Sequence, residues 1–148
     1  MSARIRHAGV ADIDTLFDIR TSVRQNHLSR VQLAEMGITP AALKDALESG
    51  PCAWIAELDG VAGGFAMIDP ESGEVFALFV RPHCEGLGLG QLLLAAAEEQ
   101  LFAEHEHIWL VTDGGEGIRA NGFYLKQGWT LAGRVDERDV RYEKHRPL

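Results

Sequence analysis

The chain has 148 residues, of which 46% are hydrophobic and 24% are charged, and its formal net charge at pH 7 is −8. These values are typical of a single globular domain over residues 1–148. The negative net charge disfavours nucleic acid as a partner. It either keeps the protein soluble or attracts a cationic ligand such as an amine. No apolar run approaches membrane length, the N-terminus lacks a signal-peptide core, and Cys52 and Cys84 form no disulfide framework, so we expect a cytoplasmic protein with no membrane partner.

The first 50 residues contain one strand signal and two helical regions. Residues 4–8 are predicted to form a short opening strand. A second helical region covers residues 28–48; it is broken at Gly37 and restarts after Pro40. The helix between the strand and this region carries an apolar stripe made of Ile13, Leu16, Phe17, Ile19 and Val23.

Polar side chains border this stripe and end the first helix. Arg20 is separated by three or four residues from members of the stripe, so it lies at the edge of the buried side. It either extends its charge into solvent or is held at a cleft for an anionic group, and the sequence leaves both alternatives open. Arg24, Gln25, Asn26 and His27 follow as a polar patch, in which Asn26 and His27 join Arg20 as candidates for binding a substrate.

Three strands are predicted in the middle of the chain. The apolar runs at residues 53–58 and 61–68 are joined by an Asp-Gly pair, which is a strong hairpin signal. The third strand covers residues 75–80, which are rich in β-branched and aromatic side chains, and it ends before Pro82.

A glycine-rich loop separates the third strand from the helix predicted over residues 92–101. Gly86, Gly88 and Gly90 alternate in this loop. Such a loop presents backbone N–H groups without side chains in the way, at the positive end of the helix dipole, and therefore suits a phosphate or pyrophosphate. Because the glycine spacing fails the dinucleotide fingerprint and no Gly-Lys-Ser/Thr ending is present, a nucleotide- or flavin-binding domain is disfavoured. A tight strand-to-helix turn that merely uses glycine is the alternative.

The rest of the chain is predicted to contain three more strands and one short helix. A strand over residues 107–112 precedes a short helix over residues 118–127, and late strands follow at residues 129–134 and 140–145. The predicted order is β-αα-βββ-α-β-α-ββ. It indicates an α/β domain with a mixed central sheet and helices on both faces.

Two motifs resemble those of a known family. Val80, Pro82 and the three alternate glycines, followed by a Leu/Ala-rich helix, resemble the coenzyme A loop of the GNAT superfamily of N-acetyltransferases. Residues 120–129 resemble the second signature of that superfamily, and the matching positions are Ala120, Phe123, Tyr124, Lys126, Gly128 and the closing aromatic residue Trp129. The order of the predicted elements is similar to that of the family over essentially the whole chain.

The resemblance implies an acetyl-CoA cosubstrate and direct transfer of its acetyl group to a primary amine in a ternary complex. It implies that the central strand splays from its neighbour, that backbone groups at residues 78–80 hold the pantetheine arm and thioester oxygen, and that N–H groups at residues 86–91 hold the pyrophosphate. The cofactor-binding residues implied in this way are Leu78, Phe79, Val80, Glu85, Gly86, Leu87, Gly88, Leu89, Gly90, Gln91, Gly117, Asn121, Tyr124 and Lys126.

Two positions differ from the family pattern. The Gln or Arg that usually precedes the first glycine is Glu85 here, whose carboxylate repels a pyrophosphate unless it points to solvent, and Arg81 is a candidate for the missing positive charge. The asparagine of the family falls on Gly117, for which Asn121 is a candidate replacement. These differences favour an alternative function, a non-catalytic acyl-CoA-binding regulatory or sensor module with the same fold.

The catalytic roles implied by the resemblance rest on a few side chains. Tyr124 is placed like the general acid that protonates the leaving thiolate, although an ordinary core tyrosine is the alternative. Glu74 is the first candidate for the general base, with His27 and His83 as alternatives. Asp113 follows a strand end and is a candidate for binding the substrate ammonium. No cluster has the spacing of metal ligands, so no metal is predicted. The acceptor is a small-molecule or peptide amine of unspecified identity, and a homodimer is common in such folds.

Overall fold

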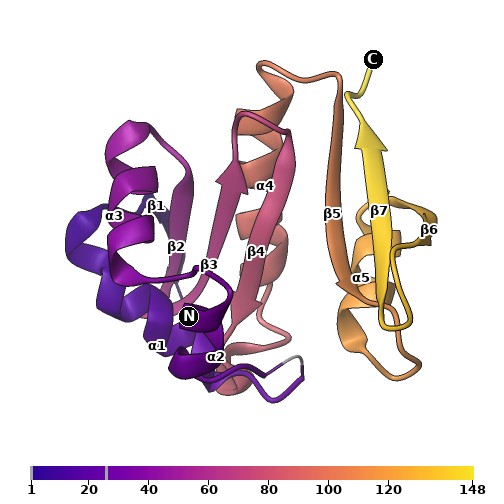
Figure 1. Ribbon diagram of the computed structural model, residues 1–148. Coiled ribbons are helices and arrows are strands. Elements are labelled where there is room, and N and C mark those ends of the chain that lie inside the picture. Colours follow the sequence, from indigo (N-terminus) through magenta and orange to yellow (C-terminus); the bar gives the residue numbers. More distant parts are fainter. Residues whose placement is uncertain (1, 26) are drawn as a thin grey trace.

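The computed structural model describes residues 2–25 and 27–148, and in these ranges the chain folds into one seven-stranded sheet covered by helices (Figure 1). The strands are β1 (Ala3–His7), β2 (Ala53–Leu58), β3 (Val61–Asp69), β4 (Glu74–Val80), β5 (His107–Asp113), β6 (Thr130–Arg134) and β7 (Asp139–His145). The helices are α1 (Ile13–Ser22), α2 (Arg30–Glu35), α3 (Pro40–Ser49), α4 (Leu89–Phe102) and α5 (Arg119–Lys126), with short 3-10 helices η1 (Val10–Asp12) and η2 (Pro82–Cys84). None of the helices in the described ranges is both long and apolar enough to cross a membrane.

The predicted α/β fold class is confirmed, and the helices lie on both faces of the sheet. α1, α2 and α3 cover one face and α4 the other (Figure 1). Neighbouring residues of β4 contact different helices. The Phe79 ring lies 4.2 Å from the guanidinium of Arg20 on α1. The side chain of Val80, the next residue of β4, approaches Gly64 on β3 from the same side as Leu93 of α4. Successive side chains of β4 therefore face helices on opposite sides.

The sheet is nearly divided between β4 and β5. Its order is β1-β2-β3-β4-β5-β7-β6, and each neighbouring pair is antiparallel except β4 and β5, which are parallel. Six residue pairs join β3 to β4 and seven join β5 to β7, but β4 and β5 are paired only at Glu74 and Trp109. Beyond that pair the two strands diverge, as the resemblance implies, and their backbone edges face an opening instead of each other.

The packing of α4 on β3 fixes the position of the glycine loop. The buried side chains of α4 are Leu89, Leu93, Leu94, Ala97 and Leu101. Gly63 and Gly64 allow this close contact, because a Cβ added at Gly63 would lie 2.9 Å from Leu89, and one at Gly64 would lie 3.1 Å from Leu93. α4 begins at Leu89 and not at residue 92 as predicted, since Leu89 is itself a core residue. Gly90 consequently belongs to the helix and not to the loop.

Candidate active site

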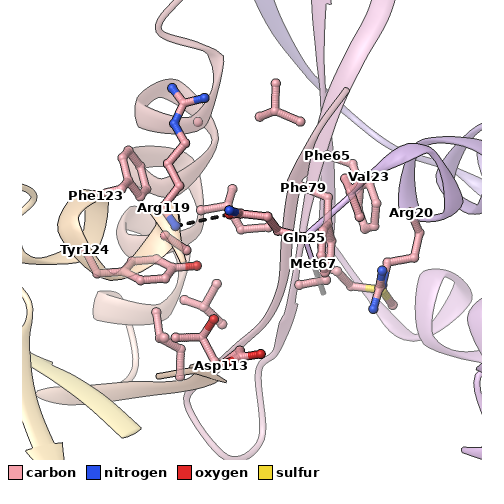
Figure 2. Close-up of a pocket in the computed structure, with 18 of the residues that line it drawn as sticks. Arg20, Val23, Gln25, Phe65, Met67, Phe79, Asp113, Arg119, Phe123 and Tyr124 are labelled. Carbon is pink, nitrogen blue, oxygen red and sulfur yellow. Dashed lines mark hydrogen bonds between the residues drawn. The ribbon is translucent and has the colours of Figure 1, made fainter. Parts of the chain in front are cut away.

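The opening between β4 and β5 leads into a cleft of about 1010 Å³. One wall is formed by β5, the glycine loop and α5, and the other by α1, α2, β3 and β4. Figure 2 shows part of both walls, with Tyr124 and Arg119 on one and Arg20 and Phe79 on the other. The predicted site residues that line the cleft are Arg20, Leu78, Phe79, Val80, Glu85, Gly86, Gly88, Leu89, Gly90, Gln91, Asp113, Tyr124 and Lys126.

Other predicted site residues lie elsewhere. Among the described residues, those predicted for the site but absent from the cleft lining are Glu74, Leu87, Gly117, Asn121, His27 and His83. His27 contacts the backbone, with its Nδ1 2.9 Å from the carbonyl oxygen of Val23. Asn26 lies outside the described residues. The two histidines thus lack the cleft position that a base acting directly on the substrate requires.

The glycine loop forms an open cradle at the N-terminus of α4. Gly86 and Gly88 have φ angles of 77° and 86°, which disfavour residues with a Cβ, and Gly88 is the N-cap of α4. A Cβ added at either position would find no other atom within 4 Å. The loop therefore leaves space for a ligand beside the first N–H groups of the helix, where an anion is favoured. Gly90 faces α5 instead: its added Cβ would lie 3.5 Å from the Phe123 ring, in ordinary van der Waals contact.

Glu85 has a partner that the sequence did not suggest. Nη1 of Arg119, the first residue of α5, lies 2.5 Å from Oε2 of Glu85, and both side chains are partly exposed at the cleft. Arg81, by contrast, donates from Nε to the carbonyl oxygen of Ala62 and pairs with Asp18 at 2.8 Å. The cation beside the glycine loop is therefore Arg119, and Arg81 is directed toward α1 and β3.

Gln25 connects the two walls of the cleft. Its Nε2 donates to the carbonyl oxygen of Gly117 at 3.0 Å. Its Oε1 accepts from the backbone N–H of Arg119 at 3.1 Å, a bond drawn in Figure 2. The carbonyl of Gly117, the position where the family pattern has asparagine, is thus already bonded to this glutamine. Because these partners are more than 90 residues apart in the chain, no local pattern could have identified the bridge.

Tyr124 combines a buried ring with a hydroxyl at the cleft. It is only 6% exposed, and its ring contacts those of Phe123, Trp129 and Tyr142 at centroid distances of 5.4–6.1 Å. Figure 2 shows the hydroxyl turned toward the cleft. Burial, and to a smaller extent Tyr142, raises the pKa of Tyr124 above the ordinary value. The phenol is protonated at neutral pH, as an ordinary tyrosine is, and the raised pKa makes it a weaker acid than an exposed phenol.

Glu74 lies where β4 and β5 join, beyond the closed end of the cleft. In the sheet register Glu74 lies opposite Trp109 of β5 and opposite Asp69 of β3. Burial, followed by the negative charge of Asp69, raises the pKa of Glu74, and the positive charge of Arg141 opposes this shift. A carboxylate with a raised pKa is a better proton acceptor near neutral pH than an exposed one.

Asp113 marks the open end of β5. It lines the cleft, and its Oδ1 accepts from the N–H of Gly115. Asn121 is occupied in holding this strand end, since its Nδ2 donates to the Asp113 carbonyl oxygen at 2.8 Å and its Oδ1 accepts from the Tyr142 hydroxyl. The structure thus gives Asn121 a supporting position behind the cleft.

No group of three or more His, Cys, Asp or Glu side chains in the described ranges is arranged to hold a metal ion.

Comparisons with known proteins agree with this architecture. The model of the acetyltransferase (GNAT) family matches residues 14–129. An uncharacterized N-acetyltransferase of Methanocaldococcus jannaschii is 30% identical over 81 residues, so the matched segment spans about half of that relative (52%) and 53% of this chain.

Solved structures share the fold over the full length. The PaiA N-acetyltransferase of Thermoplasma acidophilum, crystallised with coenzyme A, is 20% identical and superimposes with a TM-score of 0.79, covering 99% of this chain and 100% of that one. Ard1 of Thermoplasma volcanium is 14% identical with a TM-score of 0.72 and covers 100% of both chains. At these identities the likeness shows the fold alone.

Proposed function

The chain belongs to the GNAT family of acetyltransferases, and from this premise we propose that it transfers the acetyl group of acetyl-CoA directly to a primary amine in a ternary complex. The observation that carries the proposal is the cleft between the diverging strands β4 and β5. It brings together an open glycine cradle, the free edge of β4 and the Tyr124 hydroxyl. These are the three groups needed to bind a pyrophosphate, hold a thioester and protonate a leaving thiolate.

The cradle suits the coenzyme in shape and in charge. The N–H groups that follow Gly86 and Gly88 would donate to the pyrophosphate oxygens at the positive end of α4. Glu85 alone would repel it, but the ion pair with Arg119 neutralises that carboxylate and places a guanidinium beside the loop. The coenzyme complex of the Thermoplasma acidophilum relative, which has the same fold, supports this assignment.

The chemistry follows from the positions of three side chains. Asp113 attracts the ammonium group of the acceptor. Glu74 does not itself line the cleft, so it takes up a proton of this ammonium group through water. The neutral amine attacks the thioester carbonyl, which forms the N–C bond and breaks the C–S bond, and the nitrogen loses its second proton to solvent to give the neutral amide. Tyr124 gives its proton to the departing thiolate and is reprotonated from solvent, so that the products are an N-acetylated amine and free CoA.

The proposed role of Glu74 predicts an acidic limb in the pH profile. A base must be deprotonated, so kcat falls as the pH falls through the pKa of Glu74, which burial raises above the ordinary glutamate value. We expect Glu74→Gln to lower kcat about 100-fold and to remove this limb. The measurement is kcat against pH at saturating amine, with Glu71→Gln in the exposed β3–β4 turn as control. A limb that persists in the Glu74 variant would assign it to another group.

Coenzyme binding is tested by thermal unfolding with acetyl-CoA, with NAD and ATP as controls. A ligand at a hundred times its Kd adds about 2.7 kcal/mol to the free energy of unfolding, which for a chain of this size raises Tm by roughly 5–10 °C. We expect this rise with acetyl-CoA alone. An equal rise with NAD or ATP, or no rise at all, would contradict the assignment of the cradle.

A second function is favoured by Glu85 and Gly117. An acyl-CoA-binding regulatory module would keep the fold and the cradle while releasing no thiol. Glu85 forms an ion pair with Arg119, and the Gly117 carbonyl oxygen accepts from Gln25, so neither departure removes the cradle. Amine-dependent thiol release distinguishes the two functions.

A further inference from the structure

An aromatic side chain is exposed in the middle of the sheet. Phe76 belongs to β4, an inner strand, and is 47% exposed, although its neighbours Val75 and Ala77 are only 4% and 9% exposed. Within the described residues, the large apolar side chains that are both exposed and part of the cleft lining are Phe76 and Met36. Exposed apolar surface inside a cleft is unfavourable in water, so it favours a ligand that covers it.

A bulge in β4 accounts for the exposure of Phe76. Where the register of the β3–β4 pair shifts, between Met67 and Ile68 of β3, β4 has one more residue than β3, and that residue is Phe76. On its other side β4 separates from β5, since these two strands pair at Glu74 and Trp109 and then diverge. A bulge bends a strand and redirects a side chain. The Phe76 ring therefore lines the cleft instead of packing within the sheet.

Phe76 lies beside the path that the acceptor amine must take. Glu74, the proposed base, is two residues before it, and Leu78, the first residue of the segment proposed to hold the thioester, is two residues after it. At about 3.3 Å per residue, each of them is roughly 7 Å away along the strand. The amine must reach the thioester and pass a proton toward Glu74. The group attached to its nitrogen is therefore next to Phe76.

The charged side chains of the cleft act on the charged groups of the acceptor and not on this attached group. Asp113 of β5, on the wall opposite Phe79, is proposed to attract the ammonium group (Figure 2). Arg20 and Arg24 belong to the same wall as Phe76 and would act on any further charge of the acceptor. What Phe76 adds is a preference for the uncharged part of the acceptor, which is measured with amines of equal charge.

We propose that the acceptor is an arylalkylamine, a primary amine joined by a short alkyl chain to an aromatic ring, and that Phe76 is the residue that selects it. The ring of the acceptor packs on the ring of Phe76, while the amino group lies between Asp113 and the thioester. An aromatic pair gains from the relative orientation of its rings in addition to the burial of apolar area. The inference rests on the proposed N-acetyltransferase function and specifies the substrate class of the same site.

The test compares three acceptors that each carry one positive charge: ethylamine, 2-cyclohexylethylamine and 2-phenylethylamine. Their kcat/KM values are measured by thiol release with wild-type protein, Phe76→Ala and Leu131→Ala. Leu131 on β6 is a matched control, since it is 52% exposed but does not line the cleft. Each result is a ratio between two amines, compared between wild type and variant, so that differences in basicity between the amines cancel.

We expect Phe76→Ala to lower the ratio of 2-phenylethylamine to ethylamine about 10–100-fold, because the acceptor ring loses its contact. The ratio of 2-phenylethylamine to 2-cyclohexylethylamine should fall about two- to tenfold, since an aromatic ring alone gains from ring orientation. Leu131→Ala should retain both ratios. An unchanged ratio to ethylamine in Phe76→Ala, including an equal loss of both amines, would overturn the role of Phe76. An unchanged ratio to 2-cyclohexylethylamine would overturn the aromatic class.

A binding measurement separates the two levels of the proposal. The protein in complex with CoA is titrated calorimetrically with 2-phenylethylamine. Binding that is weakened in Phe76→Ala but not in Leu131→Ala, without turnover of any amine, would support the substrate class and contradict the N-acetyltransferase function. Turnover of other amines but not of 2-phenylethylamine would overturn the substrate class alone. Absence of both binding and turnover would overturn both.

Discussion

Replacing Gly88 with valine should abolish acetyl-CoA binding. Gly88 has a φ of 86° at the N-cap of α4, and the space where its Cβ would lie is empty. A valine side chain would fill the cradle and block the N–H groups proposed to bind the pyrophosphate. Loss of two charge-assisted hydrogen bonds raises Kd at least about 100-fold. The measurement is calorimetric titration of folded Gly88→Val with acetyl-CoA.

Valine at a positive φ is also strained, so the variant needs a control that carries the same strain. Gly60 has a φ of 83° in the β2–β3 turn, and its added Cβ likewise meets nothing within 4 Å. Each substitution should cost about 1–3 kcal/mol of stability. Gly60→Val should nevertheless bind acetyl-CoA like the wild type, because Gly60 does not line the cleft. Normal binding by folded Gly88→Val would show that the loop is not the coenzyme cradle.

Replacing Tyr124 with phenylalanine should lower kcat about 100-fold or more while leaving the Kd of acetyl-CoA unchanged. The phenol is the proposed donor to the leaving thiolate, and such proton transfer contributes about 10²–10⁴ in rate. Phenylalanine keeps the ring that packs against Phe123, Trp129 and Tyr142, so the wall of the cleft is preserved. The measurement is steady-state thiol release, together with Tm and acetyl-CoA titration of the variant.

The combination of results identifies the role of the hydroxyl. A fall in kcat with unchanged Tm and Kd agrees with a general acid, whose absence affects only the transition state. Unchanged turnover would make Tyr124 a core residue. Parallel losses in kcat and Tm would likewise contradict the proposed role, because they would assign the hydroxyl to folding.

Local patterns predicted the fold and one half of the cleft. The strand before Pro82, the alternate glycines and the leucine-rich helix are adjacent in the chain, so their chemistry could be interpreted directly from residues 75–101. The turn preference of glycine predicts Gly90 in the loop, whereas burial of Leu89 extends α4 past it. A core contact overrode the local preference at this position.

The other half of the cleft depends on contacts between distant segments. Arg119 lies beside Glu85 only because α5 packs on α4, and Gln25 reaches α5 only because α1 ends at the open edge of the sheet. The place of Glu74 outside the cleft lining depends on where β4 and β5 separate, which is a property of the assembled sheet. None of these relations has a signature in a short stretch of sequence.

The most direct test of the proposed function is the release of free thiol from acetyl-CoA in the presence of a panel of amines, with the products identified by mass spectrometry. The panel includes amino acids, alkylamines, polyamines and short peptides, and an amine-free reaction measures hydrolysis. We expect at least one amine to give thiol and N-acetylated product in equal amounts, well above the amine-free rate. Binding of acetyl-CoA without amine-dependent thiol release from any member of the panel would contradict the enzyme and favour the regulatory module.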